Sequence, residues 1–171
     1  FTLGNHELWS FPGFQIEQIV SKYRTILEEY GMYLLHNDLL YKEDCGLLAD
    51  PNTGTHLIKY HDLCQMNETQ IADRLRSARY VILGGLGFSG YNMEFNADNG
   101  IYRMTVDRDT EIKESKIFED LYNRLRPILA NKNTIILTHT PKKDWCREAD
   151  PNKNYVYVSG HTHRNFFHDD G

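Results

Sequence analysis

Five side chains in this sequence can ligate a metal or transfer a proton, and each follows a strand-like run. They are Asn5, His6, His139, His161 and His163. In open α/β sheets, ligands bind where loops leave the carboxyl ends of the strands. We therefore expect the four imidazoles and the amide to converge on one site.

The residue types and spacing at these positions favour a metal centre. Neutral imidazole is the commonest protein ligand for zinc, iron and similar ions, and amides or carboxylates complete the shell. His161 and His163 are two residues apart, so an extended backbone would point both side chains the same way. Gly4 and Gly160 precede two of the motifs and let the backbone turn tightly beside a bound ion or phosphate.

Three motifs occur in a fixed order: Gly4-Asn5-His6-Glu7, then a lone His139 after an apolar strand, then Gly160-His161-Thr162-His163. Together they resemble the last three motifs of the calcineurin-like metallophosphoesterases, and the match spans nearly the whole chain. The resemblance implies a four-layer α/β/β/α sandwich of sheets flanked by helices. It also implies a hydrolase of phosphate mono- or diesters with two divalent ions, which manganese, iron or zinc could supply. The ester itself is open, and nucleotides or nucleic acids are among the candidates.

The resemblance also implies a role for each residue. Asn5, His139 and His161 would ligate one metal, and His163 would ligate the other. A hydroxide that bridges two ions can attack phosphorus without a covalent intermediate. His6 would protonate or stabilise the leaving oxygen, which suits an imidazole with an ordinary pKa near 6.5. Glu7 would support the ligands or begin a helix.

The first two motifs of that family, Asp-x-His and Gly-Asp-x-x-Asp or Asn, do not occur in the 171 residues. They supply the bridging carboxylate and most ligands of one metal. Because the chain opens on an apolar triplet and stops just after the histidine pair, we expect a partial domain, incomplete at the N-terminus and the C-terminus. Two alternatives stay open: a catalytically degenerate domain that binds or scaffolds, and a one-metal histidine site with an unrelated role.

Hydrophobic periodicity predicts the elements that must position these residues. Helical spacing predicts helices over 14–30, from Asn67 to Ala78, and from Ser115 to Leu129, with Pro127 kinking or shortening the last. Runs of β-branched and aromatic residues predict strands at 1–3, 32–35, 56–60, 80–83, 101–106, 134–137 and 155–158. The alternation of strands and helices predicts one α/β domain over residues 1–171.

Composition narrows the classes of function. The chain is 40% hydrophobic and 25% charged, and its formal charge of −5 gives no chain-wide attraction to nucleic acid phosphates, although a local basic patch stays open. No apolar run approaches the roughly 18 residues that span a bilayer, so we expect no membrane partner. Three cysteines without a C-x-x-C pair fit a reducing compartment, which favours the cytoplasm. The oligomeric state is not indicated.

Two further segments are candidates for substrate contact. Residues 85–90 fit the G-x-G-x-x-G pattern of dinucleotide folds, but the residues after them lack helical spacing. We interpret this segment as a loop near the site that presents Phe88, Tyr91 and Phe95. Four residues after His139 are interpreted mainly as a solvated loop, with contact to a substrate's phosphate or base as the alternative: Lys142, Lys143, Trp145 and Arg147. The remaining histidines are interpreted as structural or solvated: His36, His56, His61 and His168.

Overall fold

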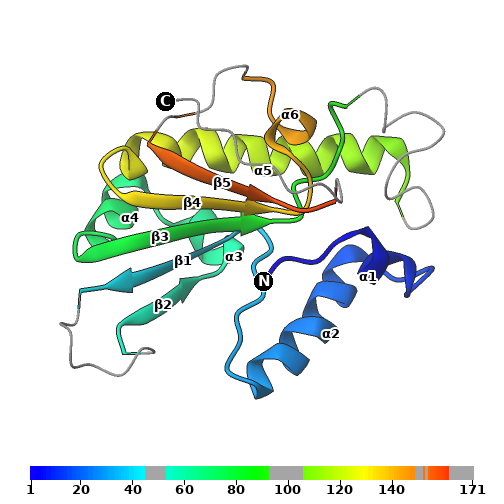
Figure 1. Ribbon diagram of the computed structural model, residues 1–171, viewed down its shortest axis with the longest axis horizontal. Coiled ribbons are helices and arrows are strands. Elements are labelled where there is room, and N and C mark those ends of the chain that lie inside the picture. The colour runs from blue at the N-terminus through cyan, green and yellow to red at the C-terminus, as the bar shows by residue number, and fades with distance from the viewer. Residues whose placement is uncertain (45–52, 93–105, 149–151, 153, 162–171) are drawn as a thin grey trace.

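The computed structural model describes residues 1–44, 53–92, 106–148, 152 and 154–161, and its centre is one five-stranded sheet (Figure 1). The strands are β1 (Asp38–Glu43), β2 (Thr55–Ile58), β3 (Ala78–Gly85), β4 (Asn133–Thr138) and β5 (Tyr155–Ser159). They lie in the order β2-β1-β3-β4-β5. β1 is antiparallel to both its neighbours, whereas β3, β4 and β5 run parallel. The carboxyl ends of these three strands therefore meet at one edge of the sheet.

Six helices are found in the described parts of the chain. They are α1 (Asn5–Trp9), α2 (Ile16–Glu29), α3 (Tyr60–Gln65), α4 (Glu68–Arg74), α5 (Arg108–Leu129) and α6 (Lys142–Trp145). Figure 1 shows α3 to α6 over one face of the sheet, with α5 running along it. α1 and α2 lie together beside the edge to which β3, β4 and β5 point. None of these helices has the length and apolar character that crossing a bilayer requires.

The larger hydrophobic core lies between the sheet and the helices above it. Strand alternation turns Leu83 of β3 and Ile136 of β4 toward this core, where they are buried with Phe118 of α5. α5 begins after Asp107, whose carboxylate accepts a hydrogen bond from the N–H of Thr110 (2.7 Å) and so caps the helix. The strong N-cap and the apolar stripe explain why this segment is helical and why it packs on the sheet.

A second, smaller core joins α1 and α2 to the loop after β3. Its buried residues are Leu3, Leu8, Ile16, Ile19, Val20, Leu34, Leu86, Phe88 and Val106. Two extended segments, 1–3 and 33–35, lead into this core and are hydrogen-bonded to each other. The amino group of Phe1 donates to the carbonyl of Tyr33 (2.7 Å), and the N–H of Leu35 donates to the carbonyl of Phe1 (2.8 Å). The Thr2 hydroxyl donates to the carbonyl of Gly85 (2.7 Å). These bonds fix the start of α1 beside the carboxyl end of β3.

The opposite side of the sheet carries aliphatic side chains on every strand. The strand register aligns Leu57, Leu40, Ile82, Ile135 and Val156 in one row, and Leu137 and Val158 in a second. We call these seven residues the aliphatic face. Val156 is 57% exposed and Val158 43% exposed, and the other five are partly buried.

The α/β class predicted from the sequence is confirmed, as are most of its elements. The helix expected over 14–30 is α2, and the runs 80–83, 134–137 and 155–158 lie within β3, β4 and β5. The helix expected from Asn67 ends at Arg74, because Ala78 already begins β3. α5 begins at Arg108 rather than at Ser115, and it continues through Pro127 to Leu129. The prediction that Pro127 shortens this helix is wrong, because α5 extends two residues beyond the proline.

Several predicted strands are wrong or displaced. Residues 1–3 and 32–35 are extended but form no strand, because their pairing consists of two hydrogen bonds between short segments. The strand predicted at 56–60 ends at Ile58, and Tyr60 begins α3. Of the run 101–106, only Val106 lies within the described residues, and it is not in a strand. β1 was not predicted.

Candidate functional site

Three segments that are far apart in the sequence bring Asn5, His139 and His161 together. Asn5 begins α1, His139 follows β4, and His161 follows β5. The Nε2 atom of His139 lies 2.9 Å from Oδ1 of Asn5 and 3.2 Å from Nδ1 of His161. The predicted convergence of these three side chains at the carboxyl ends of the strands is therefore found in the structure.

The backbone around Gly4 holds Asn5 against His139. The N–H of Gly4 donates to the Glu7 carboxylate (2.7 Å), which starts α1 and buries Asn5 to 4% exposure. A Cβ atom at Gly4 would lie 2.6 Å from Cε1 of His139, too close for any side chain. Only glycine lets the backbone approach the imidazole in this way. The interpretation of Glu7 as a residue that begins a helix is thus supported by its contact.

The backbone of His139 is fixed on both sides by hydrogen bonds. Its N–H donates to the carbonyl of Leu86 (3.1 Å), and its own carbonyl accepts from the N–H of Gly160 (3.0 Å). The next residue, His161, has a φ of 62°, in the left-handed region that residues other than glycine seldom occupy. This conformation accompanies the approach of the His161 ring to that of His139, with ring centroids 5.1 Å apart.

The two separations from Nε2 of His139 can be compared with those expected around one shared cation. Oδ1 of Asn5 can only accept a hydrogen bond, so Nε2 of His139 must carry the proton of that bond. The same nitrogen also faces Nδ1 of His161, and it has only one proton for the two neighbours. A cation could instead be ligated by all three atoms. Two donors bound to one ion at about 2.1 Å, 90° to 109° apart, are separated by about 3.0 to 3.4 Å. The separations of 2.9 and 3.2 Å are close to this range.

The set of ligands is nevertheless small. Within the part of the chain that the structure describes, no group of three or more histidine, cysteine, aspartate or glutamate side chains could hold a metal ion. Asn5 adds the third donor here, and it is an amide. His163, the ligand predicted for a second metal, lies outside the described residues.

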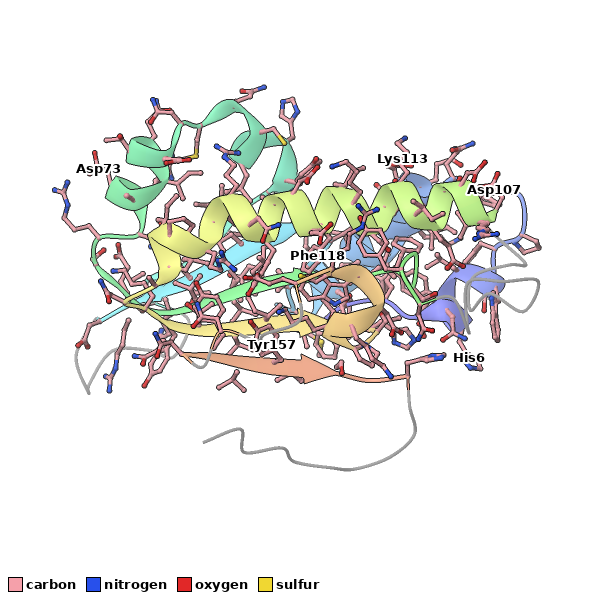
Figure 2. All side chains as sticks on the ribbon, turned by 90° about the horizontal axis from the view of Figure 1, so that it is seen from above. His6, Asp73, Asp107, Lys113, Phe118 and Tyr157 are labelled. Carbon is pink, nitrogen blue, oxygen red and sulfur yellow. The ribbon has the colours of Figure 1, made fainter. Side chains whose placement is uncertain are left out.

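His6 lies next to the site but makes a different contact. It is exposed on α1, and its ring lies 4.9 Å from that of Trp9. Figure 2 shows His6 at the end of the molecule toward which β5 runs. His6 follows Asn5 in the same helix, but Asn5 is buried and His6 is exposed, and the role predicted for His6 stays a prediction.

The loop after β3 is held by carboxylates that sequence reasoning missed. The Ser89 hydroxyl donates to the buried Glu111 (2.8 Å), and the phenol of Tyr91 donates to Glu119 (3.0 Å). The amide of Asn92 donates to the Asp144 carboxylate (2.8 Å). All three acids are at most 9% exposed. In the sequence, these acids are marked only by their position on an amphipathic helix or beside a loop, which does not indicate that they are buried.

Of the three aromatic residues predicted as substrate contacts, Phe88 is buried, so that prediction is wrong for it. Phe88 is 2% exposed and belongs to the second core, so it cannot contact a substrate as the fold stands. Burial and the bond to Glu119 raise the pKa of Tyr91 to about 12, and its ring stacks under Arg147. Phe95 lies outside the described residues. No helix begins in residues 86–92, and the structure does not describe residues 93–105.

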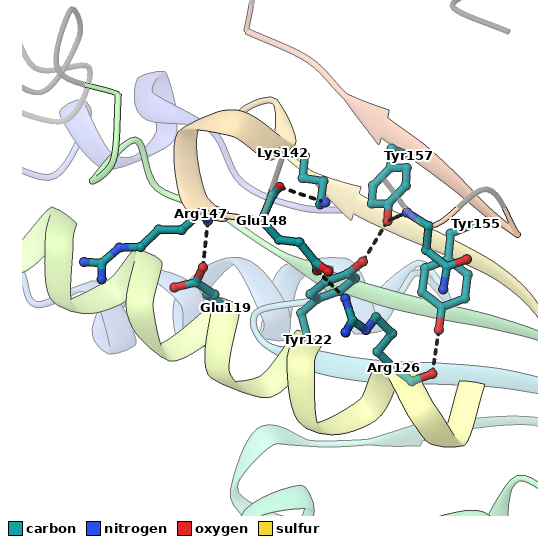
Figure 3. Close-up of polar contacts among 9 residues, drawn as sticks. Glu119, Tyr122, Arg126, Lys142, Arg147, Glu148, Tyr155 and Tyr157 are labelled. Carbon is teal, nitrogen blue, oxygen red and sulfur yellow. Dashed lines mark hydrogen bonds and ion pairs between the residues drawn. The ribbon is translucent and has the colours of Figure 1, made fainter. Parts of the chain in front are cut away.

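The segment after His139 is mainly structural (Figure 3). Lys142 donates to the carbonyl of Glu148 (3.3 Å), and its ammonium lies 5.7 and 5.6 Å from the rings of Tyr122 and Tyr157. The Tyr122 and Tyr157 hydroxyls bond each other (2.8 Å). Trp145 is fully buried in the larger core, so a contact with substrate phosphate is wrong for that residue.

The other histidines have local roles. Burial, with the charge of Arg24 as a smaller cause, lowers the pKa of His36 to about 4. The His56 ring stacks on Tyr41 at 5.0 Å. His61 bonds Gln65 on the surface (2.8 Å), and His168 lies outside the described residues.

Comparisons of the chain with protein families, with curated proteins and with solved structures found no significant match. Function is therefore inferred from the residues that converge at the edge of the sheet.

Proposed function

We propose that the protein is a metal-dependent hydrolase of phosphate mono- or diesters, of the calcineurin-like type. The observation that carries the proposal is the approach of Asn5 and His161 to one nitrogen of His139, at 2.9 and 3.2 Å. These three residues would hold one divalent ion, and His163 would contribute to a second. Manganese, iron and zinc all suit imidazole and amide ligands.

Within this proposal, each residue of the chain has a separate task. A pair of divalent ions lowers the pKa of bound water and neutralises charge on a phosphate ester. Asn5 and the two imidazoles fix the position of the phosphorus centre relative to α1. His6 is exposed and next to Asn5, so a ring nitrogen can give a proton to the leaving oxygen.

The four-layer sandwich is also part of the proposal. Parallel strands are normally covered on both faces, and the aliphatic face of this sheet carries seven apolar side chains. The paired segments 1–3 and 33–35 are suited to be the edge of a second sheet over that face. A two-metal site would also need carboxylate ligands of the kind that the Asp-x-His and Gly-Asp-x-x-Asp motifs supply.

The second candidate function is a phosphoesterase-like domain that binds or scaffolds without catalysis. It is favoured by one observation: in the described residues, only two histidines and an amide meet at the site. Such a domain could still take up one metal ion or a phosphate, but it would turn over no ester.

Hydrolysis of p-nitrophenyl phosphate and its bis ester by the intact protein, with and without manganese, tests the two candidates. We expect metal-dependent turnover that His139→Ala lowers by at least about 100-fold, because it removes the nitrogen on which both other donors converge. His61→Ala is the matched control, since His61 is exposed on α3. Absence of metal-dependent turnover on every ester would exclude the hydrolase and leave the binding domain.

A further inference from the structure

We infer that Trp9 is a stacking surface for a planar aromatic group of the substrate, such as the base of a nucleotide. This inference rests on the proposed function, because it names the class of ester that the same site accepts. Trp9 ends α1, one helical turn after His6, and the two rings lie 4.9 Å apart at an angle of 47°. A group bonded to a leaving oxygen at His6 would therefore come within reach of the indole.

A second group of aromatic rings follows α1 in the sequence. The Phe11 ring lies 5.8 Å from Phe14 and 5.9 Å from Tyr23, both edge-on. Phe14 is 49% exposed, and the Lys22 ammonium lies 4.7 Å from the centroid of Phe11. Phe11 and Tyr23 are partly buried against the second core, which leaves Phe14 as the exposed ring of this group. An exposed ring near a cation suits a ligand that is both flat and negatively charged.

The other tryptophan has a different environment. Trp145 is fully buried and makes edge-on contacts with Phe118 (4.7 Å) and Tyr122 (5.6 Å), so packing explains it. Trp9 is half-buried and belongs to neither hydrophobic core. Its ring contact is with His6, the side chain proposed to serve the leaving group. The Nε1 atom of Trp9 is buried without a hydrogen-bond partner, so one edge of the indole is turned into the protein, and the partly exposed remainder is the part that a ligand at His6 would contact.

Stacking also distinguishes aromatic esters from others without any base-specific hydrogen bond. Every nucleobase and every aryl ring presents a π face, so the preference would be for flatness rather than for one base. The expected consequence is selectivity for aromatic over sugar or alkyl phosphates of equal charge.

Calorimetric titration of the intact protein in the presence of manganese provides the test. The probes are adenosine 5′-monophosphate and ribose 5-phosphate, which share the phosphate and the sugar and differ in the base. We expect the nucleotide to bind more tightly, and Trp9→Leu to weaken it by about tenfold, as loss of one stacked base typically does. The affinity for ribose 5-phosphate should change little, and Trp9→Phe should keep most of the nucleotide affinity.

A variant at Tyr30, Tyr30→Leu, is the matched control, because that ring is 72% exposed at the end of α2. Circular dichroism establishes that Trp9→Leu is folded. The inference is overturned if wild type does not bind the nucleotide, or if Trp9→Leu weakens both probes equally or neither. Selective nucleotide binding without turnover of any ester would exclude the hydrolase but keep the role of Trp9. Ester turnover with no effect of Trp9→Leu on nucleotide binding would keep the hydrolase and exclude the role of Trp9.

Discussion

The two faces of the sheet have similar side chains but very different surroundings. On β3, Leu83 is completely buried beneath α5, whereas its neighbour Ile82 belongs to the aliphatic face and is partly exposed. On β5, Tyr155 is buried on the helix side, and the next residue, Val156, is 57% exposed on the other. The contrast is repeated across the sheet and is not a feature of one strand.

This difference indicates that both faces of the sheet are suited to pack against other elements. A contiguous apolar surface of this kind usually marks a place where another element packs. Cover is already present at one point, because a Cβ atom at Gly84 would lie 2.6 Å from the Leu35 side chain. That point is the edge near Asn5 and His139. One of the extended segments that position the site therefore also contacts the aliphatic-face side of the sheet at Gly84.

The largest expected effect comes from truncating the helix-side residue of β3. Leu83→Ala should lower the free energy of unfolding by about 2 to 5 kcal/mol, because it opens a cavity in the larger core. Ile82→Ala, one residue away, should cost about 1 kcal/mol, because its side chain is only partly removed from water. Urea titrations of both variants of the 171-residue chain measure the difference.

Equal losses for the two variants would contradict the comparison of the faces. If a second sheet covers the aliphatic face in the intact protein, the cost of Ile82→Ala should rise there toward that of Leu83→Ala. The same pair of variants thus distinguishes a bare face from a covered one.

The parts of the fold that the sequence predicted are those set by local periodicity. The apolar stripe of α2 and the β-branched runs of β4 and β5 identify their elements directly. β1 (Asp38–Glu43) escaped prediction because its apolar residues are flanked by charges, and its strand character comes from pairing with β2 and β3. Residues 32–35 have a strand composition, but too few partners are present to form a ladder.

The sequence predicted which side chains meet at the site, but it did not predict the buried carboxylates that hold the neighbouring loop. His139 and His161 follow β4 and β5, and Asn5 follows a run that was expected to be a strand but forms none, so the meeting of the two histidines followed from topology. The carboxylates of Glu111 and Asp144, which hold the loop after β3, look like ordinary surface acids in the sequence. Their burial depends on contacts across more than twenty residues of chain, which no local pattern encodes.

A smaller effect should appear at His36, which follows Leu35 in the segment that covers Gly84. Burial lowers the pKa of His36 to about 4, below the ordinary value of 6.5. Between these values the unfolded chain binds a proton that the folded chain does not. Stability should therefore fall as the pH drops from 6.5 to 4, by up to about 3 kcal/mol. The larger core beneath the helices has no histidine among its buried residues, so it should not make stability depend on pH in this way.

Urea titrations of wild type and His36→Gln at several pH values isolate this contribution. Three other charged groups lie close: Arg24 bonds Asp38 (2.5 Å), burial raises the pKa of Asp38, and Glu17 adds a weaker field. Asp38 acts with the opposite sign, because a raised pKa favours the folded state as the pH falls. Subtracting the free energies of unfolding of wild type and His36→Gln at each pH cancels the contributions of the groups that both proteins share. Identical pH profiles would exclude the role of His36. His61→Gln, at an exposed position, is the control.

The smallest of the three effects concerns the attachment of β5 to the helix side. Tyr122 is 1% exposed, and its hydroxyl bonds that of Tyr157, which also accepts from the N–H of Asn152 (Figure 3). Tyr122→Phe removes one of these two bonds while keeping the ring in the core. The free energy of unfolding should fall by about 1 kcal/mol, the usual net value of a hydrogen bond. Val156→Thr, on the opposite face of β5, should change it by less than about 0.5 kcal/mol, because that residue is exposed. A larger loss at Val156 than at Tyr122 would mean that the aliphatic face is already covered in the 171-residue chain.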